Sequence, residues 1–124
     1  MKRISWSAAL VLASVLAPAA AWPAPARVVE ITAKRFAFEP AEIHLARGEP
    51  VTLRVTSRDV THGLFLKPLG IDLDIAPGKT SEVTVTPSAA GRFTAICDHF
   101  CGSGHGNMHL TVVVDEPGAK EASR

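Results

Sequence analysis

The sequence has no tyrosine, five phenylalanines, and only two residues each of tryptophan, cysteine and methionine. Its 13 lysine and arginine residues nearly balance 12 aspartate and glutamate residues. Nucleic-acid binding needs concentrated positive charge, so this balance argues against nucleic acid as a partner. With 124 residues the chain is also too short to build two hydrophobic cores. We therefore expect one globular domain, in which the positions of the few sulfur-containing side chains are informative.

The amino-terminal segment differs in composition from the rest of the chain. Two basic residues precede an apolar stretch over residues 4–16, and a cluster of small residues follows. This order is typical of a secretory signal peptide. We expect it to span residues 1–21 with cleavage after Ala21, the alternative cut being after Ala26.

This leader also sets the expected location of the domain. An uncleaved membrane anchor is the competing interpretation, but serines and a proline leave fewer apolar residues than the ~20 that a spanning helix needs. We predict a periplasmic or secreted domain, with membrane contact only if the leader is retained. Paired cysteines in such an oxidising compartment usually form a disulfide.

From about residue 27 onward, short segments of alternating, β-branched residues are separated by glycine and proline turn signals. No long helical period appears. The segments predicted as strands are residues 28–33, 42–46, 51–57, 62–66, 71–75, 81–86, 91–97 and 108–115. About eight strands in ~100 residues predict an all-β fold, a two-sheet Greek-key β-sandwich over residues 27–115. The tail, residues 116–124, has no apolar repeat, and we expect it to be frayed.

One segment, residues 97–108, has a composition that sandwich building does not explain. It holds both cysteines, two of the five histidines and the one methionine outside the leader. Its alternating glycines, Gly102, Gly104 and Gly106, allow positive φ angles and let the loop fold its side chains around a common centre. Thiolate and thioether groups select Cu(I), and imidazole suits Cu(II) as well. The segment therefore indicates a copper site that tolerates both oxidation states.

Strand parity supports convergence of these groups. Cys97 is the last inward-facing residue of the predicted strand 91–97, and Met108 is the first of the predicted strand 108–115. Both ends of the loop therefore point to the same interior. A further ligand should come from a neighbouring loop, and His62 in the segment Asp-Val-Thr-His is the best candidate.

The pattern C-x3-C-x3-H-x2-M, with D-V-x-H upstream, resembles the binuclear copper A (CuA) domain of cytochrome c oxidase subunit II and of nitrous oxide reductase. The segment F-x-F-x-P before a Gly-Glu-Pro turn is also similar to cupredoxins, so the resemblance covers roughly residues 36–115. It implies a cupredoxin-type sandwich that binds two copper ions per chain, one ion being the alternative. The implied ligands are bridging thiolates of Cys97 and Cys101, imidazoles of His62 and His105, the thioether of Met108, and the backbone carbonyl of His99.

The function implied by the resemblance is that of an exported electron-transfer protein serving a respiratory oxidase or reductase. We expect no enzyme activity from the domain alone, because six ligands leave no open position and no catalytic motif is present. Its partner would be a redox protein such as a c-type cytochrome or a terminal oxidase. As an accessory subunit of a membrane oxidase, it would share the activity of that enzyme. The alternatives are a copper-delivery protein for oxidase assembly and a mononuclear cupredoxin.

Simpler interpretations exist for the two cysteines. They could form a disulfide in a domain without metal, or bind structural zinc together with two histidines. A disulfide would leave the convergence of His62, His105 and Met108 unexplained, and Met108 argues against zinc.

Other side chains have their own expectations. The strand pattern places His44 and His109 on polar faces, as surface residues. The His99 side chain could lie either in solvent or beside the metal. Asp59 could orient the His62 loop through a hydrogen bond or form a simple Asx turn, the turn being favoured. Three apolar residues are expected to keep water from the sulfurs: Leu64, Phe65 and Phe100.

Overall fold

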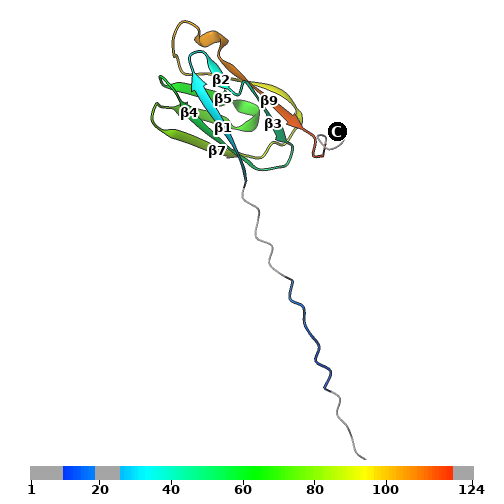
Figure 1. The fold of residues 1–124 in the computed structure, drawn as a ribbon. Helices are drawn as coiled ribbons and strands as arrows, with labels where there is room; N and C mark the ends of the chain where they lie inside the picture. The colour runs from blue at the N-terminus through cyan, green and yellow to red at the C-terminus, as the bar shows by residue number, and fades with distance from the viewer. Residues whose placement is uncertain (1–9, 19–25, 119–124) are drawn as a thin grey trace, which may run out of the picture.

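The computed structural model describes residues 10–18 and 26–118 (Figure 1). The elements within them, in chain order, are β1 (Arg27–Lys34), β2 (Ala37–Glu39), β3 (Glu42–Ala46), β4 (Val51–Ser57), β5 (His62–Leu66), the 3-10 helix η1 (Lys67–Leu69), β6 (Ile71–Ile75), β7 (Thr80–Val85), β8 (Gly91–Ile96), the 3-10 helix η2 (His105–Asn107) and β9 (His109–Asp115). The predicted cleavage after Ala21 and most of the tail predicted to be frayed lie outside the described residues. Across the described ranges, no helix is long and apolar enough to span a bilayer.

The strands form two sheets, ordered β2-β1-β4-β7 and β3-β9-β8-β5-β6. The β1–β4 and β3–β9 pairs are parallel, and the other pairs are antiparallel. This arrangement confirms the predicted all-β sandwich, and the predicted strands agree with the observed ones to about one residue at each end. Strand β2 was not predicted, because three residues are too few to show an alternating pattern.

The core lies between the sheets and is built by alternation. In β4, Val51, Leu53 and Val55 are buried while the residues between them are partly exposed. Strand β5 departs from this pattern, because three consecutive residues from His62 to Leu64 are all buried. The loop after β8 covers the outer face of β5 so closely that a Cβ atom added at Gly63 would collide with the Asp98 carboxylate. One end of β5 is thus enclosed from both sides.

The register of the five-stranded sheet brings three strand ends together. Strand β8 lies between β5 and β9 and is antiparallel to both, with Ile96 opposite Phe65 and His109. Strands β5 and β9 therefore begin where β8 ends. As a result, His62, which opens β5, lies near the residues that follow Ile96 and precede His109.

His44 lies on the outer face of β3, as expected. Its Nδ1 is 2.9 Å from Oδ2 of Asp115, and its Nε2 is 2.9 Å from Oε1 of Glu42. Hydrogen bonds to Asp115 first, and then to Glu42, raise the pKa of His44 above its ordinary value of 6.5. This small network links β3 to β9 at the rim of the sandwich.

Replacing His44 with glutamine should make stability less dependent on pH. A folded-state pKa above the unfolded value gives stabilisation that is complete below about pH 6.5 and is lost as pH rises through the folded-state pKa. In urea titrations of the metal-free protein, the free energy of unfolding of wild type minus that of His44→Gln should therefore decrease from about pH 6 to about pH 8. The control His109→Gln leaves these ion pairs intact, so its free energy of unfolding should follow that of wild type between the two pH values. A difference that stays constant between wild type and His44→Gln would contradict the assignment.

Candidate metal centre

Two buried cysteine thiols form the middle of the site. Cys97 directly follows β8, and Cys101 lies in the loop beyond it. Both thiols are free, with exposed fractions of 3% and 5%, and the two Sγ atoms are 4.0 Å apart. A disulfide has its sulfurs about 2.0 Å apart, so the thiols face each other without being bonded. The arrangement leaves both sulfurs available as ligands.

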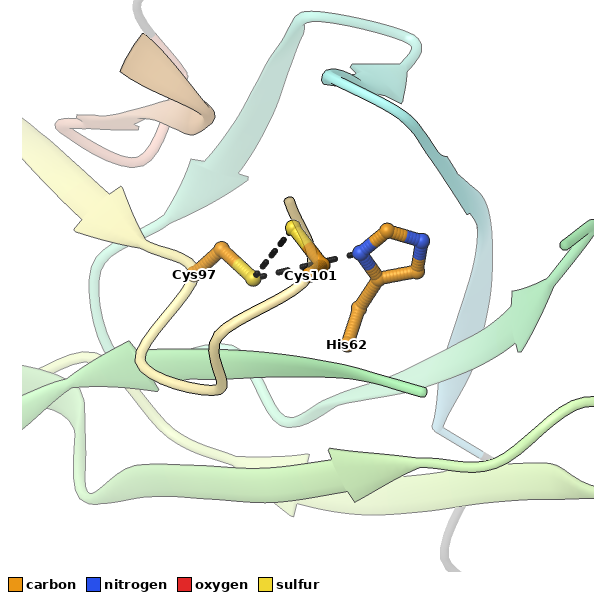
Figure 2. A group of neighbouring side chains, drawn as sticks. All are labelled: His62, Cys97 and Cys101. Carbon is orange, nitrogen blue, oxygen red and sulfur yellow. Dashed lines mark hydrogen bonds between the residues drawn. The ribbon is translucent and has the colours of Figure 1, made fainter. Parts of the chain in front are cut away.

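His62 faces these thiols from the start of β5 (Figure 2). Its Nδ1 lies 4.0 Å from the Sγ of Cys97, and its side chain is fully buried. The donor atoms of His62, Cys97 and Cys101 all lie within 4.8 Å of one another. These three residues come from two segments that are distant in the sequence, which agrees with the predicted convergence.

The carboxylate of Asp59 fixes the orientation of the His62 ring. Its Oδ1 accepts a hydrogen bond of 2.6 Å from Nε2 of His62. Because Nε2 carries the proton, the lone pair of Nδ1 is directed toward the sulfurs. Asp59 also accepts from the main-chain N–H of the adjacent Val60, whereas an Asx turn would use the N–H two residues on. The orienting contact to the His62 ring is therefore the one observed, and not the favoured Asx turn.

Asp59 is held in its charged form. Burial alone would raise the pKa of this carboxyl, but hydrogen bonds from the Arg35 main chain, His62 and Val60 outweigh that effect and hold the pKa at about 2. The carboxylate therefore stays negative at neutral pH. It can therefore accept the hydrogen bond from Nε2 of His62 throughout the physiological pH range.

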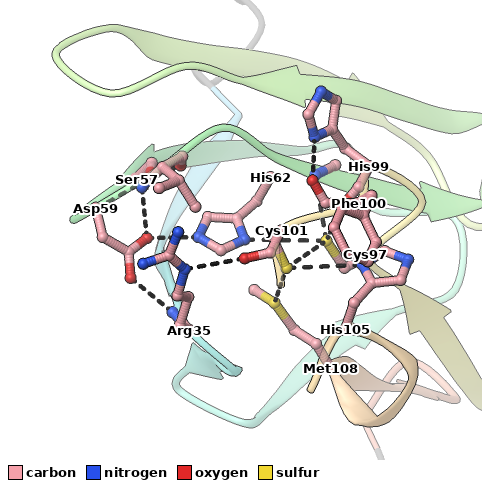
Figure 3. Close-up of polar contacts among 12 residues, drawn as sticks. Arg35, Ser57, Asp59, His62, Cys97, His99, Phe100, Cys101, His105 and Met108 are labelled. Carbon is pink, nitrogen blue, oxygen red and sulfur yellow. Dashed lines mark hydrogen bonds and ion pairs between the residues drawn. The ribbon is translucent and has the colours of Figure 1, made fainter. Parts of the chain in front are cut away.

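The remaining predicted ligands surround the same two sulfurs (Figure 3). The carbonyl oxygen of His99 is 3.3 Å from the Sγ of Cys97. From Cys101 Sγ, the Nδ1 of His105 is 3.6 Å away and the Sδ of Met108 is 3.8 Å away. Met108 is buried, as strand parity predicted. Two thiols, two imidazole nitrogens, a thioether and a carbonyl thus converge on one small volume, a set of donors that suits a soft, redox-active metal.

The metal-free thiol of Cys101 is neutral. Burial, and then the nearby Cys97, raise the pKa of Cys101 to about 11, although the charge of Arg35 opposes the change. Ligation by a metal requires the thiolate, so metal binding would release protons here.

Several expectations about the surroundings need correction. Phe100 does not shield the sulfurs, because it is 75% exposed; its ring lies beside the His105 ring, with centroids 5.8 Å apart. Leu64 is buried and Phe65 is half-buried, and on the β5 side the N–H of Gly63 lies 3.4 Å from the Sγ of Cys97. The His99 side chain is exposed, and its Nδ1 donates to the Phe100 carbonyl.

The loop glycines do not share one role. Only Gly102 has a positive φ, 139°. Gly104 is needed for a different reason: a Cβ atom there would lie 2.5 Å from the Phe36 ring. A Cβ atom at Gly106 would meet nothing within 4 Å. Of the positive φ angles that these three glycines allow, the loop therefore uses only the one at Gly102.

Sequence reasoning missed the contribution of the turn between β1 and β2. The Nε of Arg35 donates a 2.9 Å hydrogen bond to the carbonyl of Cys101, and the ring of Phe36 packs under Gly102 and Gly104. The motif F-x-F-x-P marked this region as similar to cupredoxins but gave no contact with the loop. Arg35 and Cys101 are 66 residues apart, and no local pattern pairs them.

The sequence was compared with families and curated proteins. A family model described as a cupredoxin-like domain matches residues 5–114. The chain is 35% identical over 88 residues to "Cytochrome c oxidase subunit 2" of Thermus thermophilus, covering 71% of this chain and 65% of that protein. It is 32% identical over 91 residues to "Nitrous-oxide reductase" of Cupriavidus necator, covering 70% of this chain and 14% of that protein. The chain thus spans less than two thirds of the length of these curated relatives.

A solved structure shares the fold. The periplasmic domain of subunit II of cytochrome oxidase from Bradyrhizobium japonicum aligns with a TM-score of 0.71 at 20% identity, covering 82% of this chain and 91% of that domain. The curated relatives confirm the resemblance to oxidase subunit II and nitrous oxide reductase that the cysteine motif indicated. With the family model matching most of its length, the chain belongs to the family of cupredoxin-like domains.

Proposed function

We propose that this domain is an exported one-electron carrier that holds a pair of copper ions and serves a respiratory oxidase or reductase. The observation that carries the proposal is the convergence of six donor groups on two unbonded, buried sulfurs. The proposed ligands are the thiolates of Cys97 and Cys101, Nδ1 of His62 and of His105, the thioether of Met108 and the carbonyl of His99.

The donor set fits copper better than zinc. Structural zinc takes four thiolate or imidazole ligands, whereas a thioether and a carbonyl as further groups match copper. Bound copper would supply a one-electron couple, and two thiolates four residues apart in sequence could bridge two ions. The chain itself supplies the burial, the spacing and the orientation of the ligands.

Burial excludes water from the sulfur atoms. Cys97, Cys101 and Met108 are all nearly inaccessible, and His62 is completely so. The ligands are also held by the frame, because the Cys97 N–H donates a 3.1 Å bond to the Met108 carbonyl. A dry site with fixed ligands changes little between oxidation states, which lowers the reorganisation that accompanies electron transfer.

A partner could approach from the side of His105. This imidazole is only half-buried, and the exposed ring of Phe100 lies beside it. Both residues lie on the loop surface, opposite the enclosed His62. We therefore assign docking of a redox protein, such as a c-type cytochrome or a terminal oxidase, to this side.

Export fits this role. The predicted signal peptide over residues 1–21 would deliver the domain to the periplasm, where one of its fold relatives, the oxidase domain from Bradyrhizobium japonicum, is described. A retained leader would instead anchor the same domain at the membrane surface.

Purified, copper-loaded protein should contain two copper ions per chain. The paramagnetic resonance spectrum of the oxidised form should show one unpaired electron shared by two copper nuclei, because two thiolates can bridge a pair of ions. Metal analysis measures the number of copper ions per chain, and the hyperfine pattern shows whether one or two nuclei share the unpaired electron. One copper per chain with a single-nucleus pattern would refute the binuclear centre and leave a mononuclear cupredoxin.

The ligands should differ in importance. Cys97→Ser or Cys101→Ser should abolish the binuclear spectrum, and His62→Ala or His105→Ala should damage it severely. Met108→Leu should keep the copper, because a thioether is a weak ligand that tunes the metal rather than holding it. It should raise the reduction potential, because an apolar leucine in place of the ligand disfavours the more highly charged oxidised metal. His109→Ala, beside Met108 but exposed, is the matched control and should match wild type. Release of copper by Met108→Leu together with an intact spectrum in Cys97→Ser would reverse these roles.

Copper delivery is a second candidate function, and a surface hollow favours it. A cavity of about 350 Å³ is lined by Cys97, His105 and Met108 together with Ile96 and His109. Three proposed ligands thus border a space through which a copper donor or acceptor could reach the metal.

Competition with a Cu(I) chelator separates the two functions. An electron carrier must keep its metal, so we expect reduced protein to retain copper against a chelator with a dissociation constant in the picomolar range, about −16 kcal/mol. Loss of copper should be followed over hours by the absorbance of the Cu(I)–chelator complex. Rapid transfer of all copper to the chelator would favour delivery.

A further inference from the structure

The turn between β1 and β2 is bonded to both segments that carry the proposed ligands (Figure 3). The main-chain N–H of Arg35 donates a 2.8 Å hydrogen bond to Oδ2 of Asp59. The other oxygen of that carboxylate accepts from His62. The guanidinium of Arg35 donates through Nε to the carbonyl of Cys101 at 2.9 Å. A continuous path of three hydrogen bonds therefore joins the His62 ring to the Cys101 backbone through Asp59 and Arg35.

The neighbouring Phe36 reinforces this contact. Cβ atoms added at Gly102 or Gly104 would come within 2.9 Å of its ring, so the loop backbone rests directly on the turn. The loop is otherwise held by its own short turns, in which the N–H of His105 donates to Gly102 and the N–H of Met108 donates to His105. The guanidinium of Arg35 thus donates a hydrogen bond from outside the loop to the backbone of Cys101.

The charge of Arg35 should also raise the reduction potential of the centre. An electron that enters the centre adds negative charge beside Cys101, and a nearby cation stabilises that electron-rich state. The Arg35 side chain is partly solvated, so water and salt weaken this effect without changing its sign. Lysine would keep the charge but lose the planar donor group that reaches the carbonyl.

We propose that Arg35 is a positioning residue for the metal centre. Its main chain holds Asp59, its guanidinium holds the Cys101 carbonyl, and its charge favours the reduced form. The inference rests on the proposed copper function and adds a residue that lies outside the ligand motif.

The test uses the full chain with Arg35→Gln, Arg35→Lys and the control Arg54→Gln. Arg54 lies on the outer face of β4, paired with Glu82, so its replacement removes the same charge away from the thiols. Arg35→Gln should lower the reduction potential and weaken copper retention about tenfold, within the range typical of residues that orient ligands. Arg35→Lys should restore the potential but not the retention, and Arg54→Gln should match wild type.

Unchanged potential and retention in Arg35→Gln would overturn the proposal, as would an equal change in Arg54→Gln. A metal-free measurement keeps the test independent of copper. Hydrogen exchange at the amides of His105 and Met108 should become several-fold faster in Arg35→Gln than in Arg54→Gln, and equal rates would overturn the positioning role. If wild type takes up no copper, the proposed function fails, while faster exchange in Arg35→Gln alone would still support Arg35 as the residue that holds the loop.

Discussion

The antiparallel pairing of β8 with β9 is the constraint on which the proposed metal centre depends. The pairing continues past both strands, because the N–H of Cys97 donates to the carbonyl of Met108 at 3.1 Å. Both ends of the loop are therefore fixed at one rung of the sheet, and their side chains enter the same interior. The loop needs to place only three further donors, the His99 carbonyl, Cys101 and His105, all within eight residues of Cys97. A long flexible loop would lose more conformational entropy to reach the same arrangement.

The two sides of the site differ in exposure. On the inner side, His62 is fully buried and oriented by the charged Asp59. On the outer side, His105 is half-buried and next to the exposed ring of Phe100. An electron carrier needs both properties, since it must exclude water from its sulfurs and still bring one ligand close to a partner. The sandwich satisfies both needs because the site lies at its end, where His62 opens an inner strand of the sheet and the loop leaves His105 half-buried.

Much of the fold could be predicted from the sequence, because alternation of apolar residues directly reflects which face of a strand is buried. Local spacing likewise predicted that Cys97 and Met108 point inward, and the choice of His62 followed from its position beside a strand. What escaped prediction depends on distant contacts. Arg35 reaches Cys101 only because β1 and β2 fold back over the loop, and Phe100 is exposed although its apolar character suggested shielding. Gly104 is required by the Phe36 ring rather than by its own backbone angle, and no pattern in the loop shows this.

The burial that suits electron transfer also disfavours the thiolate form of Cys101 when no metal is bound. Burial raises the pKa of the Cys101 thiol to about 11, so removing its proton without a metal would leave a charge in a poorly solvated place. The neighbouring charges act in opposite directions, because Arg35 favours the thiolate and Asp59 disfavours it. Asp59 nevertheless orients the His62 ring, so the same carboxylate that disfavours the Cys101 thiolate also directs the Nδ1 lone pair of His62 toward the sulfurs. Arg35 offsets part of that effect from the other side of the same network, and the two residues are joined by the main-chain bond at position 35. The geometry of the ligands and the charge they can carry are therefore set by the same few hydrogen bonds.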